Sequence, residues 1–436
     1  MLRTTAAVLA GKAARTAARL RGGGSAMPGL VAERVDPGFL AHALADVRDG
    51  IVVVTGTNGK TTTTKMLVAI LRAHGRRVFT NPTGSNFTRG VISSMLGELP
   101  LRGRLRADMA VLELDEAHAL KFAAAVAPTH ALLLNVARDQ LDRFAEIDHT
   151  ARLLASLAAV TTDGVVLNVD DSFVNRIAAD LADGVEVRWF GLDQSIADRL
   201  PELQEADVRD LGDTPIPVTG ERDGFLRPVD DRELEILFGR EGEGGRVGPV
   251  ALRQRGLAAM INATAATTTA RMLLGDTFSP DMAAAALATV QPPFGRGEVI
   301  DADGRPLELV LVKNPAGFTV ALGTYGASPV ATMIAINDDY ADGRDVSWLY
   351  DVSFDSLRER GVALTSGVRA YDMALRLQYD DVAVDAIEPG LDAALTRFLD
   401  ETRGEPARIF CTYTAMMALR RTLAARYDLP EIGEDA

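Results

Sequence analysis

The chain has almost no cysteine. Among its 436 residues only Cys411 carries a thiol, so neither an internal disulfide framework nor a cysteine-built zinc ribbon can form, and we expect no zinc. A cysteine content this low is typical of a cytoplasmic protein. Cys411 stands in "RIFCTYT", the pattern of a buried strand, which favours a core residue over a catalytic nucleophile.

Basic surface and long apolar runs are also scarce. The formal net charge of -14 argues against nucleic-acid binding, which depends on basic surface. No segment is long and apolar enough to span a bilayer. With 47% apolar residues, a chain of this length can bury a large core, and we expect a soluble globular protein of two or three domains.

Acidic residues are absent from the N-terminus until Glu33. A secretory signal is excluded because Lys12 interrupts the apolar stretch. At 100° per residue the segment is an amphipathic helix. Its apolar face holds Ala6, Leu9, Ala13, Ala17 and Leu20, and its opposite face holds Lys12, Arg15 and Arg19. Such a helix either packs on its own protein or contacts an anionic membrane, here the inner face of the plasma membrane, as a peripheral element.

The most informative stretch is a phosphate-binding pattern with a piece missing. "IVVVTGTNGKTTTTKML" begins at residue 51, but the common pattern G-x-x-x-x-G-K-[ST] would require glycine where Val54 stands. A β-branched strand pattern precedes the glycines, and a helical pattern follows them. This order places backbone N–H groups at a helix N-terminus, where phosphate binds. We predict a shortened phosphate loop rather than an ordinary glycine turn. The predicted ATP contacts are Gly56, Thr57, Asn58, Gly59, Lys60, Thr61 and Thr62.

Polar residues follow the next three predicted strands. Carboxyl ends of parallel strands meet at one edge of a sheet, so these residues are expected to gather beside the phosphate loop. Each of them alone is as readily a helix cap or a turn residue, whereas in register on consecutive strands they suit Mg²⁺. They are Glu113, Asp115 and Glu116, then Asn135, Asp139 and Asp142, then Asn168, Asp170 and Asp171.

The C-terminal third alternates strand and helix patterns. Strands are predicted at "LELVLVK", "VATMIAIN", "GVALTS", "VAV" and "ARIFCTYT". This alternation predicts a parallel, Rossmann-like sheet. The loops "KNPAGF" and "NDDYADGRDVSW" are expected to face a cleft between domains. Lys313 and Asn314 are candidates for ATP contacts, although a purely structural Asn-Pro turn stays open.

Several strings carry a family resemblance. "TGTNGKTTT", "LELDE", "NVARDQLDRF" and "LNVDD" resemble the central ATPase domain of the muramyl and folylpolyglutamate ligases. "GLAAMINATAATTTARML" resembles their ATP-binding helix, with Asn262 in the matching place, and "FGRGEVI" resembles their linker, with Arg296 as its arginine. More specifically, "NPTGSNFTRG", "RDQLDRF", "KNPAGF" and "NDDYADGRDVSWLYDVSF" resemble the MurT family, the ligase-like subunits of lipid II isoglutaminyl synthase.

The resemblance implies the fold. It is an α/β fold with a Mur ligase-like central P-loop ATPase domain, built on a parallel sheet, and a C-terminal Rossmann-like domain. We expect an N-terminal helical segment over residues 1–48, the central domain over 49–294 and the C-terminal domain over 295–436.

Three departures from the related ligases stand out. Gln140 occupies the position where amino-acid-adding ligases carry a histidine for a second metal, and the chain has no lysine between Lys121 and Lys313 that could be carbamylated. Many MurT-like proteins carry a four-cysteine zinc insertion, but residues 198–250 contain no cysteine. We expect a metal-free, β-rich insertion with mobile ends there.

The resemblance also implies an activity. An ATP-dependent ligase would phosphorylate the α-carboxyl of D-glutamate in the lipid II stem peptide, with Lys60 and Glu113 as catalytic residues and Mg²⁺ held by Thr61 and Glu113. Ammonia would then displace phosphate, giving D-isoglutamine. The alternatives are a stand-alone amino acid ligase of the Mur or folylpolyglutamate type and, more remotely, a non-catalytic nucleotide-regulated binding protein.

Ammonia has to come from a second subunit in this reading. The resemblance implies a glutaminase partner of the GatD type, and it implies that Asp345 supplies the acid that orients the partner's catalytic histidine. The other interpretation of Asp345 is a residue that caps a helix or bonds a turn.

Overall fold

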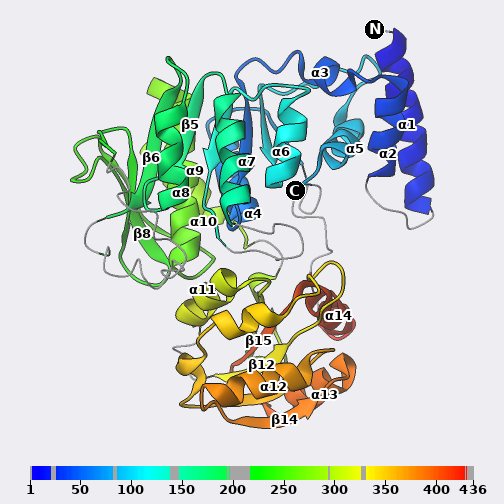
Figure 1. Cartoon of the computed structure of the whole chain (residues 1–436), viewed down its shortest axis with the longest axis vertical. Coiled ribbons are helices and arrows are strands. Elements are labelled where there is room, and N and C mark those ends of the chain that lie inside the picture. The colour runs from blue at the N-terminus through cyan, green and yellow to red at the C-terminus, as the bar shows by residue number, and fades with distance from the viewer. Residues whose placement is uncertain are drawn as a thin grey trace.

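The computed structural model contains two sheets, one in each half of the molecule, and a group of helices at the N-terminal end (Figure 1). The structure describes residues 2–20, 26–81, 86–137, 147–193, 196, 217–292, 295–325, 330–427 and 429. Within these ranges no helix has both the length and the apolar character that crossing a membrane requires.

Three helices precede the first strand. They are α1 (Leu2–Leu20), α2 (Met27–Val35) and α3 (Phe39–Leu44). Small residues allow α1 to lie close to its neighbours, because a Cβ at Gly11 would meet Ala32 of α2 and the Leu96 side chain of α5 (Thr88–Glu98). The helix therefore packs on its own protein, which is one of the two readings left open by the sequence.

The apolar face of α1 is not the side that packs on the protein. Leu9 of the apolar face is 54% exposed. Lys12 of the basic face donates from Nζ to the Leu99 carbonyl at 2.7 Å, and Arg15 lies against Gly97. Hydrophobic spacing failed here because long basic side chains lay their aliphatic stems along the protein and reach the C-terminal end of α5, where the helix dipole attracts cations.

The central sheet has nine strands in the order β2-β3-β1-β4-β5-β6-β7-β8-β9. The strands are β1 (Gly50–Thr55), β2 (Val78–Thr80), β3 (Met109–Glu113), β4 (His130–Leu133), β5 (Gly164–Asn168), β6 (Glu186–Leu192), β7 (Gly224–Pro228), β8 (Glu233–Phe238) and β9 (Arg246–Ala251). All pairs from β2 to β7 are parallel, and the last two pairs are antiparallel.

Helices cover both faces of this sheet. Successive residues of β1 point to opposite sides, so Val53 joins one apolar core and Val52 joins the other. On one side lie α5, α6 (Glu116–Ala123), α7 (Ile147–Ala159) and α8 (Ser172–Asn175). On the other side lie α4 (Lys60–Ala73), α9 (Leu257–Leu274) and α10 (Pro280–Thr289). Short 3-10 turns follow α8 and α9, at Arg176–Asp180 and Gly275–Thr277.

The predicted β-rich insertion is confirmed where the structure describes it. Its strands β7, β8 and β9 extend the central sheet, since β7 pairs in parallel with β6. Leu234, Ile236 and Val247 are fully buried and share an apolar core with Met260 of α9. Apolar burial thus joins this part of the insertion to the core of the central sheet. Residues 198–216 lie outside the described residues.

The C-terminal sheet has six strands in the order β10-β11-β15-β12-β13-β14. Its elements are β10 (Arg296–Asp301), β11 (Pro306–Leu311), α11 (Pro315–Tyr325), β12 (Ala331–Ala335), the 3-10 turns η5 (Ser347–Asp351) and η6 (Asp355–Leu357), β13 (Val362–Ser366), α12 (Ala370–Tyr379), β14 (Val384–Glu388), α13 (Leu391–Glu401), β15 (Ala407–Cys411) and α14 (Tyr413–Ala424).

The predicted parallel sheet is confirmed for five of these strands. The exception is β10, which runs antiparallel to β11 at the sheet edge and was interpreted from the sequence as a linker. Asp303 and Gly304 both have positive φ, 59° and 82°, which is the backbone of a type I′ hairpin turn. A tight hairpin therefore adds an antiparallel strand where the sequence pattern indicated only a connection.

Candidate functional site

The phosphate loop connects β1 to α4. Val54 still belongs to β1, so the loop is shorter than the common pattern and needs no glycine at that position. Gly56 and Gly59 have φ of 128° and 91°, a region that side chains rarely adopt. A Cβ at Gly56 would come within 2.9 Å of the Asn135 nitrogen, and a Cβ at Gly59 would overlap the Asn262 amide oxygen. Both glycines are required by conformation and by space.

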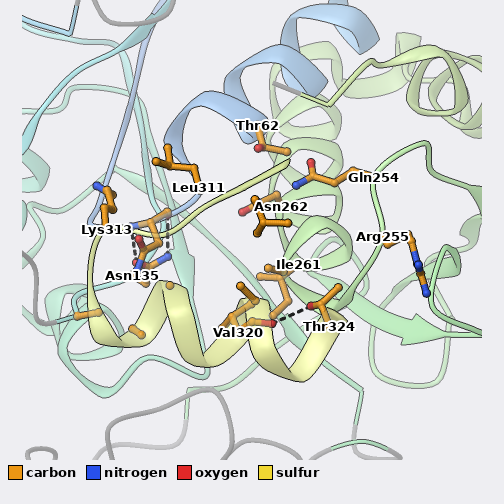
Figure 2. A pocket seen from close by; sticks show the side chains of 18 of the residues that line it. Thr62, Asn135, Gln254, Arg255, Ile261, Asn262, Leu311, Lys313, Val320 and Thr324 are labelled. Atoms are coloured by element: carbon orange, nitrogen blue, oxygen red, sulfur yellow. Dashed lines mark hydrogen bonds between the residues drawn. The ribbon is translucent and has the colours of Figure 1, made fainter. Parts of the chain in front are cut away.

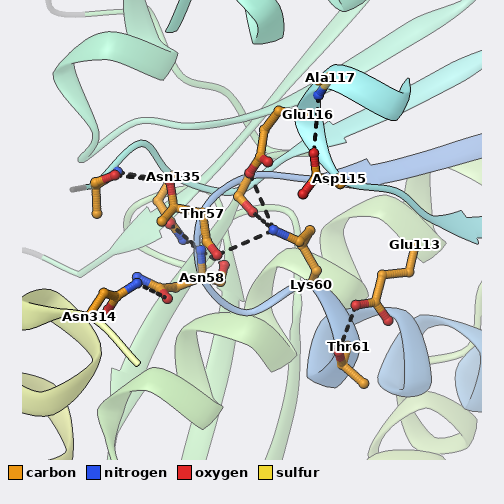
Figure 3. Close-up of polar contacts among 12 residues, drawn as sticks. Thr57, Asn58, Lys60, Thr61, Glu113, Asp115, Glu116, Ala117, Asn135 and Asn314 are labelled. Atoms are coloured by element: carbon orange, nitrogen blue, oxygen red, sulfur yellow. Dashed lines mark hydrogen bonds and ion pairs between the residues drawn. The ribbon is translucent and has the colours of Figure 1, made fainter. Parts of the chain in front are cut away.

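Asn135, just after β4, braces this loop. The Asn58 N–H donates to Asn135 Oδ1 at 2.8 Å, and Asn135 Nδ2 donates to the Asn58 carbonyl at 2.9 Å. The Thr57 N–H donates to the Asn135 carbonyl, also at 2.9 Å. These three bonds hold the loop's main chain from the end of a neighbouring strand (Figure 3). The Thr57 hydroxyl adds bonds to the Ala137 main chain.

Two glutamates lie beside the loop, and each contacts a side chain at the start of α4. The Thr61 hydroxyl donates to Glu113 Oε1 at 2.7 Å. The Lys60 ammonium donates to the Gly56 carbonyl at 2.5 Å and lies 3.3 Å from Glu116 Oε1 (Figure 3). All four of these side chains are buried. The structure thus brings Lys60, Thr61 and Glu113 together as predicted, and it adds Glu116 as the partner of Lys60.

Other carboxylates predicted at this edge have structural tasks. Asp115 accepts from the Ala117 N–H and caps α6, and Asp171 accepts from the Phe173 and Val174 N–H groups and caps α8. Asp139, Gln140 and Asp142 lie outside the described residues. Of the strand-end acids that the structure describes, only Glu113 and Glu116 meet the loop's side chains.

Thr61 and Glu113 offer oxygen ligands that suit Mg²⁺. This ion commonly takes one or two protein carboxylates and completes its shell with substrate phosphates and water. In the described ranges no group of three or more His, Cys, Asp or Glu residues is placed to hold a metal. With one hydroxyl and one carboxylate, the pair fits an ion that takes its other ligands from phosphate and water.

A cavity of about 250 Å³ opens between the two halves of the molecule. On the side of the central half, the phosphate loop, α4 and α9 line this cavity with Asn58, Gly59, Thr62 and Asn262. The Thr62 hydroxyl is buried and has no hydrogen-bond partner within the described structure. An unpaired buried hydroxyl costs free energy unless a ligand pairs with it. A polar ligand at the head of α4, where the dipole favours phosphate, would supply that partner.

The opposite wall comes from the C-terminal half. Lys313, Ala316, Gly317 and Thr324 line the cavity from the end of β11 and from α11 (Figure 2). The predicted role of "KNPAGF" as a cleft loop is thus confirmed. By contrast, none of the described residues 337–348 lines the cavity, so the second loop expected there faces elsewhere.

Polar contacts join the two halves at this cavity. Asn314 Nδ2 donates to Asn58 Oδ1 at 3.3 Å, and Asn314 Oδ1 accepts from the Gly317 N–H at 2.7 Å. Arg255 pairs with Asp231 on the central side and with Glu308 of β11 on the other. Asn314 therefore holds a turn and also contacts the phosphate loop, whereas its predicted contact with ATP stays a prediction.

Several cavity residues were not predicted. Gln254 and Arg255 precede α9, and Thr324 and Tyr325 end α11. No local pattern distinguishes them, because only the packing of the two halves brings them together.

Asp170, one of the predicted strand-end acids, also lines the cavity. Burial raises its pKa to about 6, although the Leu192 N–H donates to it at 2.6 Å. Arg296 begins β10, but its side chain lies outside the described structure.

Two aspartates in the loop after β12 differ sharply. Asp342 is 3% exposed and accepts from the Thr414 N–H at 2.8 Å, so it ties the loop to α14. Asp345 is partly exposed, and its carboxylate accepts from the Ser347 N–H at 2.8 Å at the start of η5. Of these two, Asp345 remains accessible from outside the chain.

Cys411 is fully buried in β15, and burial raises the pKa of its thiol. A protonated, inaccessible thiol cannot act as a nucleophile. The prediction that Cys411 is a core residue is confirmed.

The sequence and the fold of this chain resemble those of known proteins. Family models of the "Mur ligase middle domain" and the "MurT ligase C-terminal" match residues 54–212 and 311–416. The lipid II isoglutaminyl synthase (glutamine-hydrolyzing) subunit MurT of Streptococcus pneumoniae is 30% identical, with 98% of each chain covered. Among solved structures, MurF from Acinetobacter baumannii gives a TM-score of 0.67 at 18% identity, covering 92% of this chain and 80% of that chain. MurF from Thermotoga maritima in complex with ADP gives 0.62 at 16% identity, covering 90% and 84%.

Proposed function

The chain belongs to the MurT family, and on that premise we propose that it amidates the D-glutamate α-carboxyl of the lipid II stem peptide, with D-isoglutamine as product. It is a carbon-nitrogen ligase of peptidoglycan synthesis with the Mur ligase fold, driven by ATP. The reaction takes place in the cytoplasm, at the inner face of the plasma membrane, because the substrate is lipid-linked.

The phosphate loop carries this proposal. Its two glycines have the positive φ that a tight loop before a helix requires, and the unpaired Thr62 hydroxyl lies in the cavity beside Gly59. Of the assigned ATP contacts, five line one cavity, namely Asn58, Gly59, Thr62, Asn262 and Lys313. Asn314 of the other half donates to Asn58. This arrangement supports a nucleotide between the two halves, with its phosphates at the N-terminus of α4.

Phosphoryl transfer would be the first step. The loop N–H groups hold the phosphates, and Lys60 moves its ammonium from Glu116 to the terminal phosphate. Thr61 and Glu113 are the residues that would hold Mg²⁺, which neutralises charge on the transferring group. The substrate carboxylate oxygen bonds to the γ-phosphorus while the bond to the β-phosphate oxygen breaks. The products are an acyl phosphate and ADP.

Amide formation would be the second step. The ammonia nitrogen bonds to the acyl carbon, the carbon-oxygen bond to phosphate breaks, and the nitrogen loses a proton. A glutaminase partner of the GatD type would supply the ammonia. The buried Cys411 supports this division of labour, because the chain has no other thiol with which to open glutamine. The relatives' designation as a subunit agrees with a partner.

The partner would dock around Asp345. Next to this residue lies a surface that we call the tyrosine face, formed by Tyr350 of η5 and by Tyr371, Leu375 and Tyr379 of α12. These side chains are 48–69% exposed, and the Tyr350 and Tyr379 rings lie 6.1 Å apart. Exposed aromatic side chains grouped in this way are typical of protein interfaces.

Tyr371→Asp with Leu375→Asp should weaken assembly with the glutaminase at least about tenfold, because two anchors of the interface become charged. Analytical ultracentrifugation or titration calorimetry would measure it. The matched control is Val160→Asp with Val229→Asp, two exposed apolar residues of the central half. Assembly that is unchanged by the first pair would place the partner elsewhere.

The function itself is tested by a mass measurement. Chain and glutaminase are purified and supplied with lipid II, ATP, Mg²⁺ and glutamine. We expect the mass change of one carboxyl group becoming a carboxamide, dependent on both subunits. A product heavier by a whole amino acid residue, formed by the chain alone, would identify the alternative, a stand-alone ligase of the Mur or folylpolyglutamate type.

A further inference from the structure

The outward face of α1 carries an apolar stripe from Leu2 to Ala13. Leu2 is 92% exposed and Leu9 is 54% exposed, and Ala6 and Ala13 are exposed on the same stripe. Their spacing of four, three and four residues places them on one side of the helix. Since Lys12 and Arg15 face α5, this stripe is the side of α1 that meets solvent.

A second segment runs beside this stripe. Lys12 binds the Leu99 carbonyl, and Gly103 lies against Thr4 and Val8, so residues 99–103 follow the helix. Leu101 in this segment is 55% exposed. The next residues alternate buried and exposed, and every exposed one is an arginine: Arg102, Arg104 and Arg106.

Charge is distributed very unevenly between this end of the chain and the rest. Residues 1–108 hold 16 lysines and arginines but 6 aspartates and glutamates, a formal charge of +10 in a chain of -14. Arg104 pairs with Asp46. Arg102 and Arg106 have no ion pair with any described residue. The exposed leucines therefore lie in the basic part of an otherwise acidic protein.

We propose that this surface, formed by Leu2, Arg3, Leu9, Leu101, Arg102 and Arg106 and here called the α1 surface, docks on an anionic lipid bilayer. Leucines that enter the headgroup region beside arginines that remain at the phosphates are the pattern of peripheral membrane binding. The inference rests on the proposed function, because a lipid-linked substrate gives the protein a reason to be there.

The geometry fits such a substrate. Helix α5 starts next to the acidic residues that follow β3, since the Asp115 N–H donates to the Asn86 carbonyl just before that helix. It ends under Lys12, beside the α1 surface. With 11 residues it is about 16 Å long. The α1 surface and the phosphate loop are thus separated by roughly the length of α5, a distance that a peptide on a lipid headgroup can bridge.

The α1 surface differs from the tyrosine face in ways that favour lipid over protein. Its exposed apolar side chains are aliphatic, its charges are of one sign, and it lies at the N-terminal end of the molecule, away from the C-terminal half (Figure 1). Protein interfaces are enriched in aromatic residues, whereas anionic leaflets attract basic segments within about a Debye length.

Vesicle co-sedimentation tests the proposal with the full chain. Wild-type protein should bind vesicles of phosphatidylglycerol and phosphatidylethanolamine at low salt more tightly than vesicles of phosphatidylcholine. Arg102→Glu with Arg106→Glu should weaken the anionic binding at least about tenfold. Leu2→Ser with Leu9→Ser should weaken binding to both kinds of vesicle. The control Arg397→Glu with Arg403→Glu makes the same charge change on α13 and just after it and should bind like wild type.

The outcome is independent of whether the proposed activity is right, because binding is measured without turnover. In the assembled enzyme, the arginine variant should amidate lipid II in anionic vesicles more slowly while amidating a lipid-free muramyl peptide at the wild-type rate. Wild-type protein that ignores anionic vesicles, or a variant that binds them equally well, would overturn the proposal. So would loss of glutaminase binding in the arginine variant, which would make this surface a protein interface.

Discussion

Lys60→Ala should reduce amidation of lipid II by at least about 10²–10³-fold, the size of effect seen when one charge-stabilising donor is removed from a transition state. Lys60 is the lysine at the head of α4, and its ammonium already lies between the loop carbonyls and Glu116. Single-turnover kinetics at saturating ATP would separate the chemical step from nucleotide binding. Partner assembly should be unchanged.

Stability has to be separated from catalysis in that experiment. Removing the ammonium leaves the Glu116 carboxylate buried without its cation, which destabilises the fold. The double variant Lys60→Met with Glu116→Gln removes both charges and should recover the melting temperature without recovering activity. Lys65→Ala, one turn further along the same helix, is the matched control and should remain active. Near-normal turnover by Lys60→Ala would reject the ATP site at this loop.

Asp345→Asn should lower glutamine-dependent amidation by a factor on the order of 10³–10⁴, as expected when an acid that orients a catalytic histidine loses its charge. The substitution keeps an oxygen for the Ser347 N–H, so the start of η5 should stay folded. Glutamine hydrolysis by the assembled complex, followed as glutamate release, is the direct readout.

Ammonium salt distinguishes this effect from damage to the ligase. Asp345 does not line the cavity in which we propose that ATP binds, so free ammonia should restore part of the amidation in Asp345→Asn. Asp351→Asn, an exposed acid at the other end of η5, is the control and should hydrolyse glutamine normally. If Asp345→Asn hydrolyses glutamine at the wild-type rate, Asp345 is only a turn residue that accepts a hydrogen bond from the Ser347 N–H.

The sequence predicted the parallel strands and the glycine loop between β1 and α4 well, because both depend on local patterns. Apolar runs end at polar residues such as Glu113, and glycine, lysine and threonine in order mark the helix start. The antiparallel edge strand β10 was missed because its pairing depends on a hairpin at Asp303 and Gly304. Strand direction at an edge is set by the turn, which a hydrophobic pattern does not record.

The side of α1 that packs on the protein could not be predicted, for a different reason. Assigning helix faces from apolar spacing assumes that the apolar side chains face the protein. Helix α1 instead packs through small residues such as Ala7 and Gly11 and through the reach of Lys12. Cavity residues such as Gln254 and Arg255 could not be found either, since they become neighbours of Lys313 only when the two halves meet.

The brace at Asn135 has a consequence for how the phosphate-binding motif is defined. Its amide bonds to the main chain of Asn58, which any residue at position 58 would present, so the loop's shape depends less on residue 58 than on a residue 77 positions away. A pattern written over consecutive letters contains the first position and omits the second. A search profile for loops of this shortened kind should therefore treat the strand-end asparagine as one of the motif's own positions.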